Sequence, residues 1–169
     1  MELNIIKKFG KDYLQFDNVE EIVFKNFGGD GNGRGDIKGE FGIKLNNYPE
    51  IVERLQESKN KFGIPWNVKT WVPKDDSEPV TYLTVKVSVK NEDSLVLVIN
   101  RQGRNIELPA TEIGCLDSMP IESCDIDIRA YDDEYRGEPF RSAYLDGIYV
   151  RSGASRFKDR LAAEEHPEE

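Results

Sequence analysis

The chain has 169 residues, 38% of them hydrophobic and 10% aromatic, which is enough for the core of one domain but short for two. A charged fraction of 33% and a net charge of −9 predict a well-hydrated surface, and no apolar run approaches the roughly 18 residues of a membrane helix. Duplex-binding domains are usually basic, so this acidic balance argues against one. We expect a single domain over residues 1–160, an acidic tail over 161–169, and no membrane partner.

The first third of the chain predicts two strands, separated by a loop and followed by a helix. Residues 20–27 are rich in β-branched and aromatic side chains, and six of the next twelve residues, 28–39, are glycine. Residues 40–45 alternate apolar with polar or small side chains, as in a half-buried strand. Pro49 is suited to begin a helix, and apolar residues at helical spacing extend that helix to about Ser58.

The middle of the chain predicts a hairpin. Residues 81–90 alternate strictly, with Leu83 and every second residue after it apolar, and a turn separates them from the apolar run 95–99. An extended segment, 66–72, precedes this hairpin and contains both tryptophans. Because Trp66 and Trp71 lie on opposite faces of an ideal strand, one can be buried and the other exposed, and the sequence leaves open which.

The last third predicts two strands and a terminal helix. The strands cover residues 124–131 and 142–150, and a helix over 155–163 is capped by its first residue, a serine. In the second strand the apolar positions change phase across Gly147, which indicates a β-bulge or a tight bend. The fold class is therefore mainly β. A five-stranded Greek-key barrel with short inserted helices and a C-terminal helix fits the strand count if 66–72 is peripheral.

We find no catalytic constellation, so we expect neither an enzyme nor a cofactor or metal site. His166 is the only histidine, and the two cysteines, Cys115 and Cys124, cannot complete a zinc site alone. The glycine-rich loop lacks the phosphate-loop pattern, and Arg34 and Phe41 occupy ligand positions of its partial match to a calcium loop. Function must then come from binding.

Cations and tyrosines on strand faces and loops are the candidate contacts for a single-stranded nucleic acid. Cations neutralise phosphates, and tyrosine rings stack on unpaired bases. The glycine loop itself is either a plain hairpin loop or one that orders on a bound strand. Carboxylates at 132–134 could pair with the neighbouring arginines and abolish the site. The candidate DNA-binding residues are Arg34, Lys38, Tyr82, Lys86, Lys90, Arg129, Tyr131 and Arg141.

A family resemblance rests on the same last third. A strand ending in Arg-Ala-Tyr131, a charged loop containing Gly137, a strand carrying Ala-Tyr-Leu and Ile-Tyr-Val, and an acidic end follow a Gly/Arg loop, residues 40–45 and an inserted helix. This layout resembles phage-encoded single-stranded DNA-binding proteins of the OB-fold type with an acidic C-terminal tail.

The resemblance implies a five-stranded OB-like barrel that binds single-stranded DNA without sequence preference during phage replication or recombination. It also implies the host cytoplasm as the location and replication or recombination proteins as partners. A homo-oligomer is left open.

A different class of function also fits the charge. An acidic protein-binding inhibitor could block the nucleic-acid groove of a host or defence protein, and the carboxylate-rich turns at 75–78 and 132–134 favour such a role. A small structural β-protein of a virion is a third alternative. DNA binding separates the first two, because an inhibitor of this kind should ignore DNA and bind a basic protein.

Overall fold

A computed structural model describes residues 1–29, 36–90 and 94–152. In this part of the chain the protein forms ten strands and two helices, so the expectation of a mainly β fold is confirmed. The elements are β1 (Glu2–Lys8), β2 (Lys11–Val19), β3 (Ile22–Asn26), β4 (Asp36–Lys44), α1 (Pro49–Glu57), β5 (Val68–Trp71), β6 (Val80–Lys90), β7 (Val96–Arg101), β8 (Arg104–Leu108), the 3-10 helix η1 (Ala110–Asp117), β9 (Ile121–Tyr135) and β10 (Glu138–Ser152).

The strands expected from the sequence all exist, but their number was wrong. Ten strands are present, whereas the sequence analysis assigned seven extended segments and expected a five-stranded barrel; the three strands that it missed are β1, β2 and β8. The expected helix after Pro49 is α1, and the 3-10 helix η1 follows β8. The C-terminal helix expected at 155–163 lies outside the described residues.

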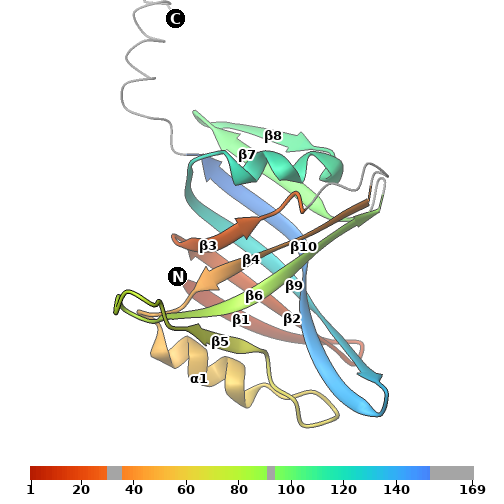
Figure 1. Ribbon diagram of the computed structural model, residues 1–169. Coiled ribbons are helices and arrows are strands. Elements are labelled where there is room, and N and C mark those ends of the chain that lie inside the picture. The colour runs from red at the N-terminus through yellow and green to blue at the C-terminus, as the bar shows by residue number, and fades with distance from the viewer. Residues whose placement is uncertain (30–35, 91–93, 153–169) are drawn as a thin grey trace, which may run out of the picture.

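One continuous sheet contains all the strands. Its main path runs β1-β2-β9-β10-β6-β4-β3, with β5 beside β6 and the β7–β8 pair beside β10. Neighbours on the path are antiparallel, except that β10 meets β6 in parallel at Tyr144 and Lys86. Figure 1 shows α1 at one end of the curled sheet and β7, β8 and η1 at the other. Only Glu20 and Glu21 separate β2 from β3, although these two strands lie near opposite ends of the path.

The expected bulge in the last strand is confirmed. The pairing of β10 with β9 shifts register between Leu145 and Gly147, and the buried positions change from Leu145 to Ile148. The shift divides β10 between two partners. Its first half meets β6 at Tyr144, and its second half, from Gly147 onward, runs parallel to β7.

The core fills the inside of the curled sheet with large apolar side chains. Every second residue of β6 from Leu83 is buried, as the alternation predicts, and the rings of Phe27 and Phe41 stack with centroids 4.5 Å apart. Trp66 is 1% exposed and Trp71 is 47% exposed, which answers the question that the sequence left open. In the described residues no helix has both the length and the apolar character needed to cross a membrane.

Gly39 marks the closest approach between β4 and the chain that follows β3. A Cβ at this position would collide with the carbonyl oxygens of Asn26 and Phe27 and would lie 2.7 Å from the carbonyl carbon of Phe27. These are backbone atoms that cannot rotate away. By contrast, a Cβ on Gly147 would meet nothing closer than 3.5 Å.

We therefore expect Gly39→Ala to lower the free energy of unfolding by about 1–3 kcal/mol, the usual cost of overpacking. Gly147→Ala is the matched control and should be close to neutral. Urea denaturation of both variants measures the difference. Equal stability of the two would mean that β3 and β4 are not packed as closely as described.

Candidate nucleic-acid interface

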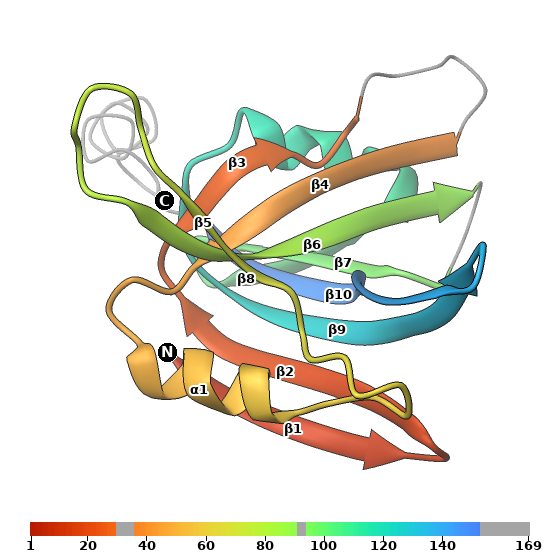
Figure 2. The ribbon, with the colours of Figure 1, turned by 60° about the horizontal axis from the view of Figure 1, so that its bottom comes forward.

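A groove opens where three segments meet at one side of the sheet. They are the β1–β2 hairpin, the chain just after α1, and the β9–β10 pair, and Figure 2 shows their turns on the same side of the molecule. The groove has a volume of about 590 Å³. We call it the basic groove; its lining residues are Lys7, Gly10, Lys11, Asp12, Tyr13, Lys59, Asn60, Lys61, Arg129, Ala130, Tyr131, Asp132 and Arg141.

Positive charge dominates this lining. Its four lysines are exposed, and in the described part of the chain none of them forms an ion pair. Arg129 is half-exposed and is paired with Asp146, at 2.6 Å between Nη1 and Oδ1. The lining includes two carboxylates, Asp12 and Asp132, and both are bound to Arg141. The groove thus keeps a cationic surface on a protein of net charge −9.

Arg141 is buried beneath the groove and holds its floor together. Its guanidinium donates to Asp12 at 2.5 Å, to Asp132 at 2.7 Å, and to the carbonyl oxygen of Ser58 at 3.3 Å. The same group lies 4.6 Å from the centre of the Trp66 ring. With a side chain only 1% exposed, Arg141 cannot reach a phosphate. This contradicts its predicted role as a DNA contact, because the guanidinium is buried and already paired with two carboxylates.

Asp132 connects this buried group to the loop after α1. Asn60 donates from Nδ2 to Asp132 at 2.9 Å, and Oδ1 of Asn60 accepts the backbone N–H groups of Phe62 and Ile64. Burial alone would raise the pKa of Asp132, but the hydrogen bonds from Arg141 and Asn60 outweigh it and lower the pKa. These bonds fix the loop that carries Lys59 and Lys61 over the sheet.

A second feature adjoins the groove on the outer face of β6, β10 and β9. We call it the aromatic–cation cluster; its members are Lys86, Arg129, Tyr131, Phe140 and Tyr144. The Tyr144 ring is central: Lys86 Nζ lies 6.0 Å and the Arg129 guanidinium 5.3 Å from its centroid. The ring of Tyr131 lies 6.0 Å from the rings of both Tyr144 and Phe140. Arg129 and Tyr131 belong to both features, so cluster and groove form one surface.

Tyr131 is held in place although it is 48% exposed. Its hydroxyl donates to Asp133 Oδ2 at 3.0 Å, and this hydrogen bond raises the pKa of Tyr131 and keeps the phenol protonated. Asp133 therefore pairs with a tyrosine, and Asp132 with a buried arginine. Of the carboxylates at 132–134, only Asp132 forms an ion pair with Arg141, and none forms one with Arg129 in the described structure.

The candidate residues divide into groups. Lys86, Arg129 and Tyr131 come together in the cluster. Tyr82 lies apart, in an aromatic patch where the Phe24 ring contacts both Tyr82, at 4.9 Å, and Trp71, at 5.6 Å. Two further candidates, Lys38 and Lys90, are exposed toward the far ends of β4 and β6. Arg34 lies outside the described residues.

Several groove residues were missed. No strands were assigned before residue 20, so Lys7, Lys11 and Tyr13 were not placed on a surface. The signal was present: Asp12, Leu14 and Phe16 alternate as buried positions in β2, which turns Lys11 and Tyr13 outward. The same alternation in β10 would have placed Tyr144 on the outward face of that strand.

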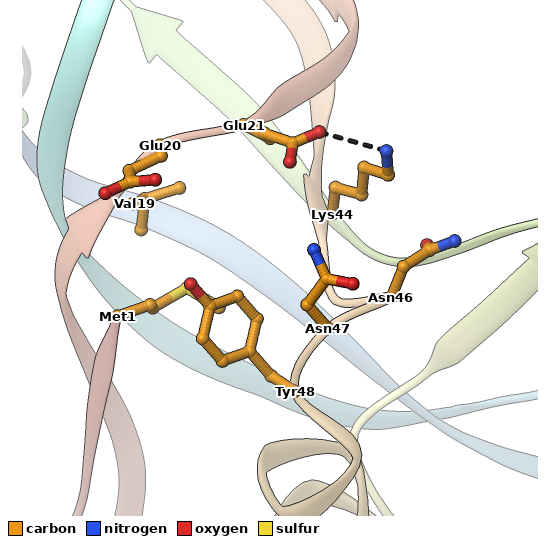
Figure 3. A pocket seen from close by; sticks show the side chains of 8 residues that line it. All are labelled: Met1, Val19, Glu20, Glu21, Lys44, Asn46, Asn47 and Tyr48. Atoms are coloured by element: carbon orange, nitrogen blue, oxygen red, sulfur yellow. Dashed lines mark ion pairs between the residues drawn. The ribbon is translucent and has the colours of Figure 1, made fainter.

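A smaller pocket at the β2–β3 junction has the wrong charge for this role. It holds about 60 Å³ and is lined by Glu20, Glu21 and Lys44 among others. Figure 3 shows Lys44 paired with Glu21, at 3.0 Å. With its lysine already bound to a carboxylate, and with two glutamates in the lining, this pocket does not suit a polyanion. Within the described residues, no group of three or more His, Cys, Asp or Glu side chains could hold a metal ion.

Comparisons with known proteins give a family and several structural neighbours. A family model described as a putative phage ssDNA-binding domain matches residues 5–165. The single-stranded DNA-binding protein from bacteriophage Enc34 aligns with a TM-score of 0.48 at 12% identity, covering 99% of this chain and 100% of that one. Its complex with ssDNA gives 0.44 at 14% identity, covering 92% and 98%. The single-stranded DNA-binding protein gp2.5 of bacteriophage T7 gives 0.36 at 13% identity, covering 86% and 92%. No curated protein matches the chain.

The buried position of Arg141 makes a stability prediction. Arg141→Met leaves two carboxylates without their shared cation and should lower the free energy of unfolding by about 3–5 kcal/mol. Arg129→Met is the matched control, because its exposed ion pair should contribute less than about 1 kcal/mol. Guanidinium denaturation followed by circular dichroism compares them. An Arg141 variant as stable as the Arg129 variant would contradict the network.

Proposed function

This chain belongs to the family of putative phage ssDNA-binding domains, and on that premise we propose that it binds single-stranded DNA in the basic groove and on the aromatic–cation cluster. The observation that carries the proposal is the charge of the groove. Four exposed lysines, none of which forms an ion pair with another described residue, line the groove, and its two carboxylates are already bound to Arg141. Such a surface attracts phosphates through counterion release.

The cluster favours a single strand over a duplex. The rings of Tyr131 and Tyr144 can stack only on bases that are free of a complementary strand. Neither stacking nor phosphate pairing involves contacts to the edges of the bases, which carry the sequence information, so binding should be independent of sequence. We include Lys86, Arg129, Tyr131 and Tyr144 as contacts. The half-buried Tyr82 and the exposed Lys38 and Lys90 remain proposed contacts for a longer strand, together with Arg34.

We further propose that the sheet is an elaborated OB-like barrel. If β2 and β3 are taken as one bent strand, the path β2-β9-β10-β6-β4-β3 returns to its own start through five strands. The backbone N–H of Lys44 at the end of β4 donates to the carbonyl oxygen of Glu21 at that bend, at 3.2 Å, which supports this closure. In this interpretation β1, β5 and the β7–β8 pair are additions to the barrel.

In this proposal the protein acts without catalysis, in phage replication or recombination, in the host cytoplasm. Residues 1–160 form the binding domain, and the acidic segment 161–169 is a tail available to replication or recombination proteins. The alternative of an acidic inhibitor is less favoured, because a surface that mimics nucleic acid would present carboxylates where the groove presents lysines.

The lysines of the groove should set the salt dependence of binding. For each lysine replaced, as in Lys11→Met and Lys61→Met, the slope of log K against log salt should become shallower by about 0.7. Lys74→Met is the control, because Lys74 lies in the β5–β6 connection on the opposite side of the molecule (Figure 2). Fluorescence anisotropy of a labelled oligothymidylate measures the slopes. Equal slopes in all variants would place the DNA elsewhere.

Stacking on Tyr131 makes a separate prediction at constant salt. Tyr131→Ala should weaken binding by about 1–3 kcal/mol, the usual contribution of one stacked base. Tyr131→Phe keeps the ring and loses only the hydrogen bond to Asp133, so it should bind almost as well as the unaltered protein. If the Phe variant is as weak as the Ala variant, the hydroxyl matters and stacking is the wrong explanation.

A further inference from the structure

The turn of the β1–β2 hairpin exposes a phenylalanine in a conformation that this residue rarely adopts. Phe9 has φ 54° and Gly10 has φ 73°, and the paired residues Lys8 and Lys11 flank them. Two consecutive residues of positive φ form a type I′ turn, for which Asn-Gly is the preferred sequence. The Phe9 side chain is 90% exposed, so packing within the chain does not explain it.

The other two-residue hairpin turns of the described chain show what is unusual here. Gln102-Gly103 joins β7 to β8, and Arg136-Gly137 joins β9 to β10, with positive φ at all four residues. Their first residues are polar and suit a solvated turn. Phe9 instead leaves a large apolar ring in water, in a backbone region that is uncommon for bulky residues. An observed outlier of this kind is a reason to look for a bound partner.

The surroundings of Phe9 indicate the chemistry of that partner. Lys7, Gly10 and Lys11, on either side of it in the hairpin, line the basic groove, so the ring stands at the rim of this groove. Lys8 Nζ lies 5.6 Å from the centre of the Phe9 ring. A flat apolar ring surrounded by lysines matches a repeating unit that offers both a base and a phosphate.

We propose that Phe9 is a DNA-binding residue whose ring stacks on a base of the strand in the basic groove, while Lys8 and Lys11 pair with the adjacent phosphates. This inference rests on the proposed function of the groove and extends it to the β1–β2 turn. The hairpin presents the ring on a short turn between paired strands, so little backbone freedom is lost when DNA binds. Binding also removes the exposed ring from water.

The test uses a substitution that should improve the fold and impair binding. In Phe9→Asn the turn gains its preferred sequence, so Tm should rise, whereas affinity for a short oligothymidylate should fall about 5- to 150-fold. The salt dependence should keep its slope, because no charge is lost. Phe9→Trp should restore the affinity, because tryptophan also stacks.

Two controls make the result specific. Gln102→Asn makes the same change in the β7–β8 turn and should raise Tm without affecting affinity. Replacing the thymines of the probe by abasic sites should weaken binding by the unaltered protein more than binding by Phe9→Asn. Both proteins lose stacking on Tyr131 and Tyr144, but only the unaltered protein also loses stacking on Phe9.

The outcomes separate the two proposals. If the unaltered protein does not bind the oligothymidylate, the proposed function and this inference both fail. If it binds, and Phe9→Asn binds equally well, the groove remains a binding site and the role of Phe9 is wrong. Loss of affinity together with a lower Tm would also overturn the inference, because it would indicate a folding defect.

Discussion

The buried guanidinium of Arg141 is the interaction on which the rest of the surface depends. It joins β10 to β2 through Asp12, to β9 through Asp132, and to the end of α1 through the carbonyl of Ser58. These are the segments that surround the basic groove. The same contacts use both carboxylates of the lining, so one buried cation determines the shape of the groove and preserves its charge.

An acidic protein can therefore present a cationic surface without being basic overall. The protein has a net charge of −9, but the lysines of the groove come from two separate segments, residues 7–11 and 59–61, that are brought together by folding. Carboxylates elsewhere on the molecule should repel a polyanion and direct it toward the groove. The net charge alone gave the wrong expectation for nucleic-acid binding, because it sums over the whole surface, whereas a ligand contacts only one face.

The sequence predicted what depends on local patterns. Alternation identified β6, and the phase change across Gly147 identified the bulge in β10. The sequence analysis also proposed Lys86, Arg129 and Tyr131 as DNA contacts, and the sheet brings these three side chains together. It could not give the pairing of Arg141 with Asp12, which lie 129 residues apart, and so it took a buried group for a contact. Because the β1–β2 hairpin was missed, two of the four lysines of the groove were not recognised, although the alternation in β2 was present in the sequence.

The central position of β10, between β9 and β6, has a consequence for synthesis of the protein. β10 is the last strand that the structure describes, and it joins the β9–β2–β1 part of the sheet to the β6–β4–β3 part. A nascent chain on the ribosome therefore carries two incomplete half-sheets until residues near 152 have emerged from the exit tunnel. Their apolar inner faces stay open to water during that interval, so the sheet should complete its folding only after β10 has left the tunnel.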